Sequence, residues 1–221
     1  VVHAALLPVT VAVVSVSGAS LVGFVLRAVS GCFGGRLDML IQRVVDIQLA
    51  FPTILLAITV VAVLGSSVPI LIFVFVLAGW VRYVRVIRAQ TLVIRETQYV
   101  EAARAMGGSS TRILRKYVGP NLLTDILALL NLEMARIVLL ESGLSYLGLG
   151  VQPPLPTWGN MLNDGRLYIN SAWWFVTFPG LAIVIVVLGT TFVAEGLRSV
   201  YAPRESSGGD NREVSSAGES F

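Results

Sequence analysis

Three ionisable residues lie inside an apolar stretch of the chain, where side chains of this type can line a polar path. Asp125, Glu133 and Arg136 fall within Leu122–Leu140, a range otherwise dominated by apolar residues. If this range crosses a membrane, each charge costs about 2.5–3.5 kcal/mol at the helix centre on insertion scales. Such residues therefore face a polar cavity or pair with one another, because an isolated charge is unfavourable there.

The spacing of these three residues allows two interpretations. Glu133 and Arg136 are three residues apart, so they can pair on one face of a helix. At about 100° per residue, Asp125 lies within about 80° of both. This face either lines a translocation path or gate, or it is a structural pair between helices with Asp125 in contact with water at the membrane edge. A proton relay has less support, because His3 is the only histidine and no second acidic ladder exists.

The longest polar stretch runs from Tyr99 to Pro120 and is basic, with a glycine pair beginning at Gly107. Thr97 is a candidate N-cap for a short helix, Tyr99–Met106, that Gly107 would end. Alanines in this helix allow another protein surface to approach closely, and Glu101 supplies a directional polar contact. A helix this short is marginal alone. It either binds a protein partner or lies on anionic lipid as an amphipathic connector, and these residues alone allow both.

The sequence lacks the patterns of several catalytic and ligand-binding classes. With His3 as the only His and Cys32 as the only Cys, neither an ordinary zinc site nor a disulfide framework within one chain is expected. No G-x-x-x-x-G-K-[ST] pattern occurs, so ATP hydrolysis by this chain is not expected. An intramembrane protease would need paired catalytic residues such as Asp46 and Asp125, and neither has a recognisable surrounding motif. A peptidase assay on the purified chain would discriminate this alternative.

Composition indicates a membrane protein. The 221 residues are 55% hydrophobic and 13% charged, with a mean hydropathy of +0.80, whereas soluble domains carry about 25% charged residues. The net charge of +3 does not indicate nucleic-acid binding, because the basic residues lie in loops between apolar ranges rather than in a separate patch. We expect one all-α membrane domain over 1–203 and a disordered cytoplasmic tail over 204–221.

Five apolar ranges are candidate membrane spans, since about 20 helical residues cross a ~30 Å hydrocarbon core. Pro52 is expected to kink the second span. The third helix is expected to continue beyond the membrane with Arg82, Arg85 and Arg88 on one side. Between the fourth and fifth spans, 142–172 is expected to be a long, irregular external segment. The spans are expected at Leu6–Leu26, Val44–Leu64, Val68–Val81, Leu122–Leu140 and Trp173–Val193.

The distribution of Lys and Arg predicts the orientation of these spans. All but Arg136 and Arg166 of the 16 Lys and Arg residues lie in 27–43, in 82–120 or in the C-terminal tail. The positive-inside rule therefore places the 82–120 loop and the C-terminus in the cytoplasm. With an odd number of spans, Val1 then lies outside, which suggests that a preceding span is missing from this sequence.

The polar stretch resembles the EAA motif of permease subunits of bacterial ABC importers. The resemblance rests on a Glu-Ala-Ala triplet, three further residues, a glycine and a closing proline. The chain departs from the family at Tyr117 and Gly119, where the family has Ile and Leu. By this resemblance, 96–118 is a cytoplasmic coupling loop whose helix sits in a cleft of the ATP-binding subunit. The residues assigned to ATPase coupling are Glu101, Ala102, Ala103, Gly107 and Pro120.

Three other stretches resemble the second permease subunit of dipeptide and oligopeptide importers, a branch that also contains nickel importers. They are Ala50-Phe51-Pro52, the LSYLGLGVQPP segment at 144–154 and the PTWGNML segment at 156–162. Gly196-Leu197-Arg198 also fits. The resemblance covers 9–204. Such subunits normally have six spans, so this chain resembles one that lacks the first span and the external segment following it.

The resemblance implies a permease without enzymatic activity of its own, moving dipeptides or oligopeptides across the bacterial plasma (inner) membrane. The implied partners are a companion permease, two cytoplasmic ATP-binding subunits that carry ATP and Mg, an extracytoplasmic substrate-binding protein and the lipid bilayer; nucleic acid is not among them. The external segment would dock the substrate-binding protein and form a gate, or serve as a packed structural loop. A nickel permease of the same branch and a truncated, nonfunctional remnant are the remaining alternatives.

Overall fold

The computed structural model describes residues 1–33, 35–95, 97–98, 100, 105–107 and 119–201, and the elements within these ranges are all helices. The all-α fold expected from the sequence is confirmed. The elements are η1 (His3–Ala5), α1 (Leu6–Phe33), α2 (Gly35–Ala50), α3 (Thr53–Leu64), α4 (Val68–Arg95), α7 (Gly119–Tyr146), α8 (Trp158–Gly165), η3 (Arg166–Tyr168) and α9 (Trp174–Tyr201).

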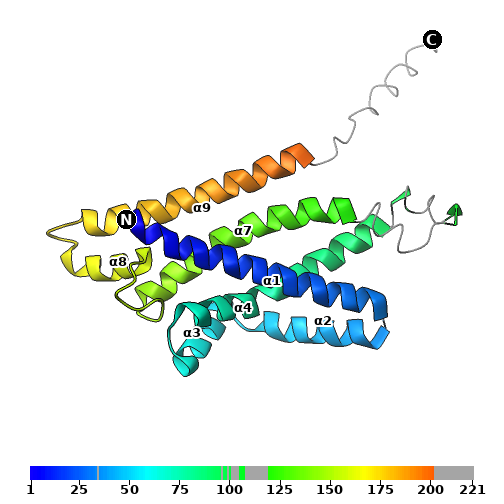
Figure 1. Cartoon of the computed structure of the whole chain (residues 1–221), viewed down its shortest axis with the longest axis horizontal. Helices are drawn as coiled ribbons and strands as arrows, with labels where there is room; N and C mark the ends of the chain where they lie inside the picture. Colours follow the sequence, from blue (N-terminus) through cyan, green and yellow to red (C-terminus); the bar gives the residue numbers. More distant parts are fainter. Residues whose placement is uncertain (34, 96, 99, 101–104, 108–118, 202–221) are drawn as a thin grey trace, which may run out of the picture.

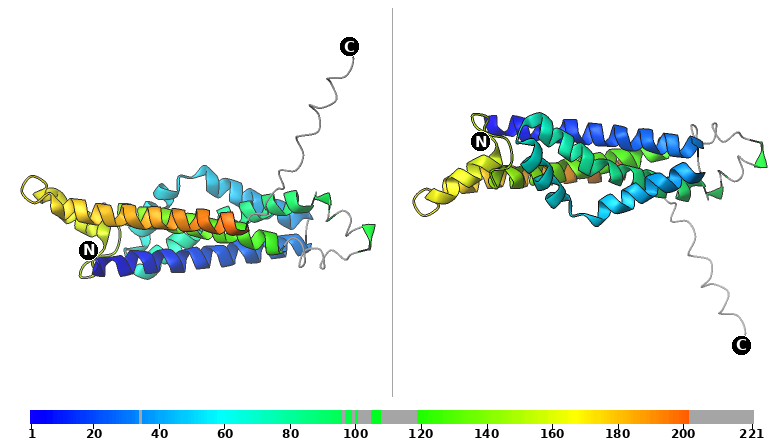
Figure 2. Two further views of the ribbon diagram at one scale, coloured as in Figure 1. Left: turned by 90° about the horizontal axis from the view of Figure 1, so that it is seen from above. Right: turned by 90° about the horizontal axis from the view of Figure 1, so that it is seen from below.

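Four long helices, α1, α4, α7 and α9, form an elongated bundle (Figures 1 and 2). Each has 28 residues, or about 42 Å of helix, which exceeds the ~30 Å of a bilayer core. The most extensive packing is between α1 and α4 and between α7 and α9. The α1–α2 turn, the end of α4, the start of α7 and the end of α9 share one end of the bundle, while the N-terminus and α8 lie at the other (Figure 1).

Three helical segments are long and apolar enough to cross a membrane, namely His3–Arg27, Val68–Val93 and Trp174–Gly196. The bent pair α2 and α3 meets the same criterion when taken together, which makes up to four candidates among the described residues. The helix α7, which contains the predicted span Leu122–Leu140, carries several charges and is not among them. The expected total of five spans therefore stays a prediction.

The second predicted span is broken at Pro52 rather than gently kinked. The helices α2 and α3 meet at an angle of 88°, and Pro52 occupies the N-cap position of α3 with ψ of 125°. Proline has no N–H to continue a helical hydrogen-bond ladder, and its ring obstructs the preceding turn. The Gln48 side-chain amide donates to the carbonyl of Leu77 in α4, so the end of α2 is anchored beside the break.

The first helix extends further than its apolar run predicts, since α1 continues past Arg27 to Phe33. The expected continuation of the third predicted helix beyond Val81 is confirmed, because α4 runs to Arg95. The part of α4 that is long and apolar enough to cross a membrane is Val68–Val93, which includes Arg82, and the predicted span end at Val81 stays a prediction. The prediction that the segment 142–172 is irregular is partly wrong. This segment contains the last turn of α7 and all of α8 and η3.

Small residues bring α1 and α4 into close contact. A Cβ atom built on Gly23 would lie 2.5 Å from Cβ of Tyr83 and 3.1 Å from the carbonyl oxygen of Trp80. One built on Gly18 would lie 2.8 Å from a methyl group of Val76. Glycine at such crossings allows two helix backbones to approach, as is common between membrane helices. This contact sets the register between α1 and α4.

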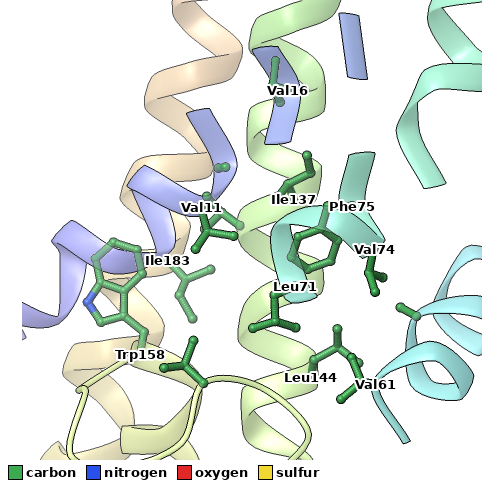
Figure 3. Close-up of a cluster of buried hydrophobic side chains, with 14 of the residues drawn as sticks. Val11, Val16, Val61, Leu71, Val74, Phe75, Ile137, Leu144, Trp158 and Ile183 are labelled. Atoms are coloured by element: carbon green, nitrogen blue, oxygen red, sulfur yellow. The ribbon is translucent and has the colours of Figure 1, made fainter. Parts of the chain in front are cut away.

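The main apolar core lies toward the end of the bundle that carries α8 (Figure 3). Phe75 and Leu71 of α4, Val11 of α1 and Leu144 of α7 are almost completely buried there, and Trp158 at the start of α8 closes the cluster. In contrast, only 11% of the most apolar window of α9 is buried within the chain. The outer face of α9 therefore offers an apolar surface to lipid or to a partner.

Candidate functional site

Glu133 of α7 is held between two arginine side chains at the middle of the bundle. Its Oε1 lies 2.6 Å from Nη1 of Arg82 on α4, and its Oε2 lies 3.3 Å from Nη1 of Arg136, one turn further along α7. The Glu133 side chain is only 4% exposed, whereas those of Arg82 and Arg136 are 33% and 26% exposed. The predicted pair of Glu133 with Arg136 is confirmed, and a third member is added from another helix.

The cluster also reaches the break between α2 and α3. Nη2 of Arg136 donates to Oγ1 of Thr53, the first residue of α3, at 2.8 Å. A single chain of polar contacts therefore connects α4, α7 and the start of α3. We name Arg82, Glu133, Arg136 and Thr53 the central cluster.

The central cluster carries an excess of one positive charge, because two arginines face one carboxylate. A pocket of about 210 Å³ lies beside it, between the α2–α3 break and α4. Arg82 and Thr53 line this pocket, so part of the cluster faces it directly. The other lining residues are Gln48, Leu49, Phe51, Pro52, Leu56, Ala78 and Val81.

Two members of this cluster are missing from the sequence prediction, and one predicted member is untested. Arg82 follows an apolar run and resembles the end of a span, which is why it is counted with the cytoplasmic loop. Thr53 has no charge to mark it. The predicted third residue, Asp125, lies on α7, but its side chain is outside the described residues.

A second buried acidic residue, Glu141, lies two turns beyond Glu133 on α7. Its side chain is completely buried, Oε1 accepts a hydrogen bond of 2.7 Å from the Ser145 hydroxyl, and Oε2 has no hydrogen-bond partner within the described chain. The backbones of Gly150 and Gly159 pack so closely on this turn that a Cβ on either would collide with Ser145. Glu141 thus lies where α7 packs against the segment 142–172, and the span boundary predicted at Leu140 excluded it.

At the opposite end of the bundle, Asp38 ties three helices together. Its carboxylate contacts Nη1 of Arg27 in α1 at 2.9 Å and Nη2 of Arg88 in α4 at 3.1 Å, and it also accepts a hydrogen bond from the Ser30 hydroxyl. Asp38 itself is in α2. These contacts fix the ends of α1 and α4 relative to α2, next to the point where the polar loop leaves α4.

The proposed coupling residues are only partly described. Glu101, Ala102 and Ala103 lie outside the described residues. Gly107 is exposed in a turn with φ of +79°, a left-handed conformation suited to glycine at a helix end. Pro120 is the second residue of α7, a position that proline tolerates because the first helical N–H groups have no intrahelical acceptor.

Among the described side chains, no group of three His, Cys, Asp or Glu is arranged to hold a metal ion. The central cluster combines a carboxylate whose two oxygens each contact a guanidinium group with N–H donors on Arg82 that make no further hydrogen bond among the described residues. This arrangement can position a polar group or an anion within an apolar bundle, and it can act as a link that opens when the helices shift.

Comparison with known proteins places the chain in a family. Residues 19–207 match the family model described as binding-protein-dependent transport system inner membrane component. The chain is 39% identical over 204 residues to the dipeptide transport system permease protein DppC of Alkalihalophilus pseudofirmus, covering 92% of this chain and 67% of that protein. It is 33% identical over 191 residues to the probable D,D-dipeptide transport system permease protein DdpC of Escherichia coli K12, covering 86% and 64%. The chain thus spans about two thirds of the length of these relatives.

Solved structures share the same fold. The chain superposes on the MetNI methionine ABC transporter in an inward-facing conformation with a TM-score of 0.70 and 18% identity, covering 91% of this chain and 96% of that one. An amino acid ABC transporter with histidines matches with a TM-score of 0.62 and 14% identity, covering 88% of both chains. The helical bundle, the family match and the relatives agree: the chain belongs to the binding-protein-dependent transport system inner membrane components, in their branch of dipeptide and peptide ABC permeases.

Proposed function

We propose that this chain is the peptide-translocating permease subunit of an ATP-driven, binding-protein-dependent importer. The similarity to named dipeptide permeases, at 39% and 33% identity over most of the chain, carries this proposal. A nickel permease is not favoured, because the relatives found at this similarity are named for peptides or dipeptides. The chain itself performs no hydrolysis, and the ATP-binding partner subunits supply it.

The partners follow from the importer class. A companion permease completes the translocation path, two cytoplasmic ATP-binding subunits carry ATP and Mg, and an extracytoplasmic binding protein delivers the substrate. The exposed apolar face of α9 supports contact with lipid or with the companion permease. The external segment, 142–172, is the candidate docking surface for the binding protein and the candidate outer gate.

The polar loop is the candidate connection to the ATPase. Glu101–Gly107 would bind in a cleft of the ATP-binding subunit, and Ser109–Pro120 would transmit its movement into α7. Because α7 begins at Gly119 and carries Glu133, a shift of its start changes the position of the central cluster. An ATP-driven movement at the loop can therefore favour one of two arrangements of the bundle.

The central cluster is the candidate path or gate. Glu133, Arg136 and Asp125 all belong to α7, and two of them, Glu133 and Arg136, contact residues that line the pocket. Opening the bundle between α4 and α7 would separate Arg82 from Glu133. We assign the loop 82–120 and the C-terminus to the cytoplasmic side of a bacterial inner membrane. The end of α4, the start of α7 and the end of α9 lie at one end of the bundle (Figure 1), which supports placing them on the same side.

The test is uptake by the complete complex in proteoliposomes. The chain, its companion permease, the ATP-binding subunits and the binding protein would be reconstituted, and uptake of a labelled dipeptide, a longer peptide and Ni²⁺ would be compared. We expect ATP-dependent uptake of peptide that is lost when the ATPase cannot hydrolyse ATP. Uptake of Ni²⁺ alone would establish the nickel alternative, and a complex that assembles but transports neither substrate would support the remnant alternative.

A further inference from the structure

The pocket beside the central cluster is lined by one charged residue, Arg82, by the first residue of α3 and its N-cap, Thr53 and Pro52, and by several apolar residues. We propose that this pocket binds the C-terminal carboxylate of a peptide during its passage, with Arg82 as the residue that contacts it. The inference rests on the proposed function, since it assigns a binding site within the translocation path of a peptide permease.

The charges favour an anion over a cation. Both oxygens of Glu133 are occupied, Oε1 by Arg82 and Oε2 by Arg136, so this carboxylate is not available to bind an amino group. Arg82 uses Nη1 for Glu133 and is 33% exposed. An arginine has five N–H donors in a planar fork, so Arg82 retains donors for a second carboxylate. One of the two arginines that share this single carboxylate, Arg82, thus lines the pocket.

The N-terminus of α3 also favours an anion over a cation in the pocket. The first N–H groups of a helix have no intrahelical acceptor, and the helix dipole places partial positive charge there. In α3 the N-cap residue is Pro52, whose side chain makes no capping hydrogen bond. Pro52 and Thr53 both line the pocket. Backbone donors therefore lie on the same side of the pocket as Thr53, across from Arg82 of α4.

The size and walls of the pocket limit what part of a substrate it holds. About 210 Å³ is less than the ~300–1,000 Å³ of pockets that enclose whole drug-sized ligands. Apolar residues such as Phe51, Leu56 and Val81 also line the pocket, and they can contact the carbon atoms next to a bound carboxylate. The pocket fits a terminal carboxylate with its adjacent carbon atoms rather than an entire peptide.

The test compares a labelled dipeptide with its C-terminal amide in proteoliposomes containing the full complex. The binding protein has its own preference between these two substrates, but this preference cancels when the acid-to-amide uptake ratio of a variant is divided by that of the wild type. We expect Arg82→Gln to lower the ratio at least about tenfold, as for one lost hydrogen bond to a charged group. Arg82→Lys should retain part of the preference for the free acid over the amide.

The matched control is Arg85→Gln. Arg85 is an exposed residue of the same helix that does not line the pocket, and this variant should keep the wild-type ratio.

A second variant tests the pocket independently in case the Arg82→Gln complex does not assemble. Ala78→Leu fills the pocket from α4 without changing any charge, and it should lower the same ratio. An unchanged ratio in whichever of these variants assembles would overturn the carboxylate site while leaving peptide transport intact. A wild-type complex that transports neither dipeptide nor amide would instead contradict the proposed function itself.

Discussion

Arg82 and Glu133 are 51 residues apart in sequence, yet Nη1 of Arg82 lies 2.6 Å from Oε1 of Glu133. This ion pair joins α4 to α7 at the middle of the bundle. The carboxylate is buried and shared with Arg136, while the guanidinium of Arg82 faces a pocket. Removing the Glu133 carboxylate therefore leaves two arginines without their counterion, whereas removing Arg82 leaves Glu133 paired with Arg136.

Glu133→Gln should destabilise the protein more than Arg82→Gln. Without the Glu133 carboxylate, two guanidinium groups within the bundle lose their counterion. Removing one partner of a buried pair costs about 3–5 kcal/mol, and the partial exposure of both arginines places this variant near the lower limit. Without Arg82, Glu133 keeps its contact with Arg136, and we expect a loss of about 1.5 kcal/mol, the lower end of the range for a hydrogen bond to a charged group.

Thermal unfolding of the detergent-purified complex, followed by size-exclusion chromatography after heating, would measure this difference. The exposed Arg85→Gln variant serves as a control and should lie within about 0.5 kcal/mol of wild type. Equal apparent Tm values for Glu133→Gln and Arg82→Gln would contradict the asymmetry derived from the shared carboxylate.

Glu141→Gln should have the opposite outcome from Glu133→Gln. Glu141 is fully buried and accepts one hydrogen bond from Ser145, but it contacts no cation among the described side chains. Burying a carboxylate without a cation is unfavourable. A glutamine of the same shape keeps an acceptor for Ser145, so the apparent Tm should be unchanged or raised.

The comparison for Glu141 is Glu141→Ala, which removes the acceptor and leaves a cavity. This variant should lose about 2–4 kcal/mol, as for other buried truncations. If Glu141→Gln lowered the apparent Tm as much as Glu133→Gln, a cation from a partner subunit would have to contact Glu141 in the complex.

Gly23→Ala should disrupt the contact between α1 and α4. The added Cβ would lie 2.5 Å from Cβ of Tyr83, so the helices must separate, at a cost of about 1–3 kcal/mol for overpacking. The matched control is Gly189→Ala in α9, where nothing lies within 4 Å of the added atom. That variant should be neutral or stabilising, because alanine is the better helix former. Similar apparent Tm values for the two variants would show that α1 and α4 do not approach this closely.

Gly107→Leu should uncouple ATP hydrolysis from uptake. The residue is exposed, and none of the described residues lies within 4 Å of an added Cβ, so a bulky side chain is expected to obstruct a partner rather than the described part of the chain. Hydrolysis should continue while peptide uptake falls, as measured in the same proteoliposomes. Normal uptake in this variant would contradict the assignment of the coupling helix.

Backbone strain has to be separated from loss of partner contact in that experiment. Gly65 also has a positive φ, +88° against +79° for Gly107, and its added Cβ would likewise meet nothing within 4 Å. Gly65→Leu imposes backbone strain of about 1–3 kcal/mol or more in the turn between α3 and α4, because φ of +88° with ψ of 170° is a conformation essentially restricted to glycine. It should lower stability without uncoupling transport.

Local patterns in the sequence predicted much of the fold. Apolar runs predicted the long helices, because each long helix needs an apolar surface toward lipid or core. Pro52 marked the break between α2 and α3, since proline removes a backbone donor wherever it occurs. The EAA-like residues and the LSYLGLGVQPP segment predicted the family, which the match over residues 19–207 confirms. The coupling role of Glu101 and the expected five spans remain predictions.

By itself, the sequence determined the helical class, the permease family and the pairing of Glu133 with Arg136, because each depends on residues that are near one another along the chain. Only the tertiary structure decided that Arg82 joins this pair, that Thr53 completes the cluster and that a pocket opens beside them. Those contacts depend on the register between α4, α7 and the start of α3. Close packing at residues such as Gly23 sets the register between α1 and α4 in the same way, and hydropathy along the chain contains no information about such registers.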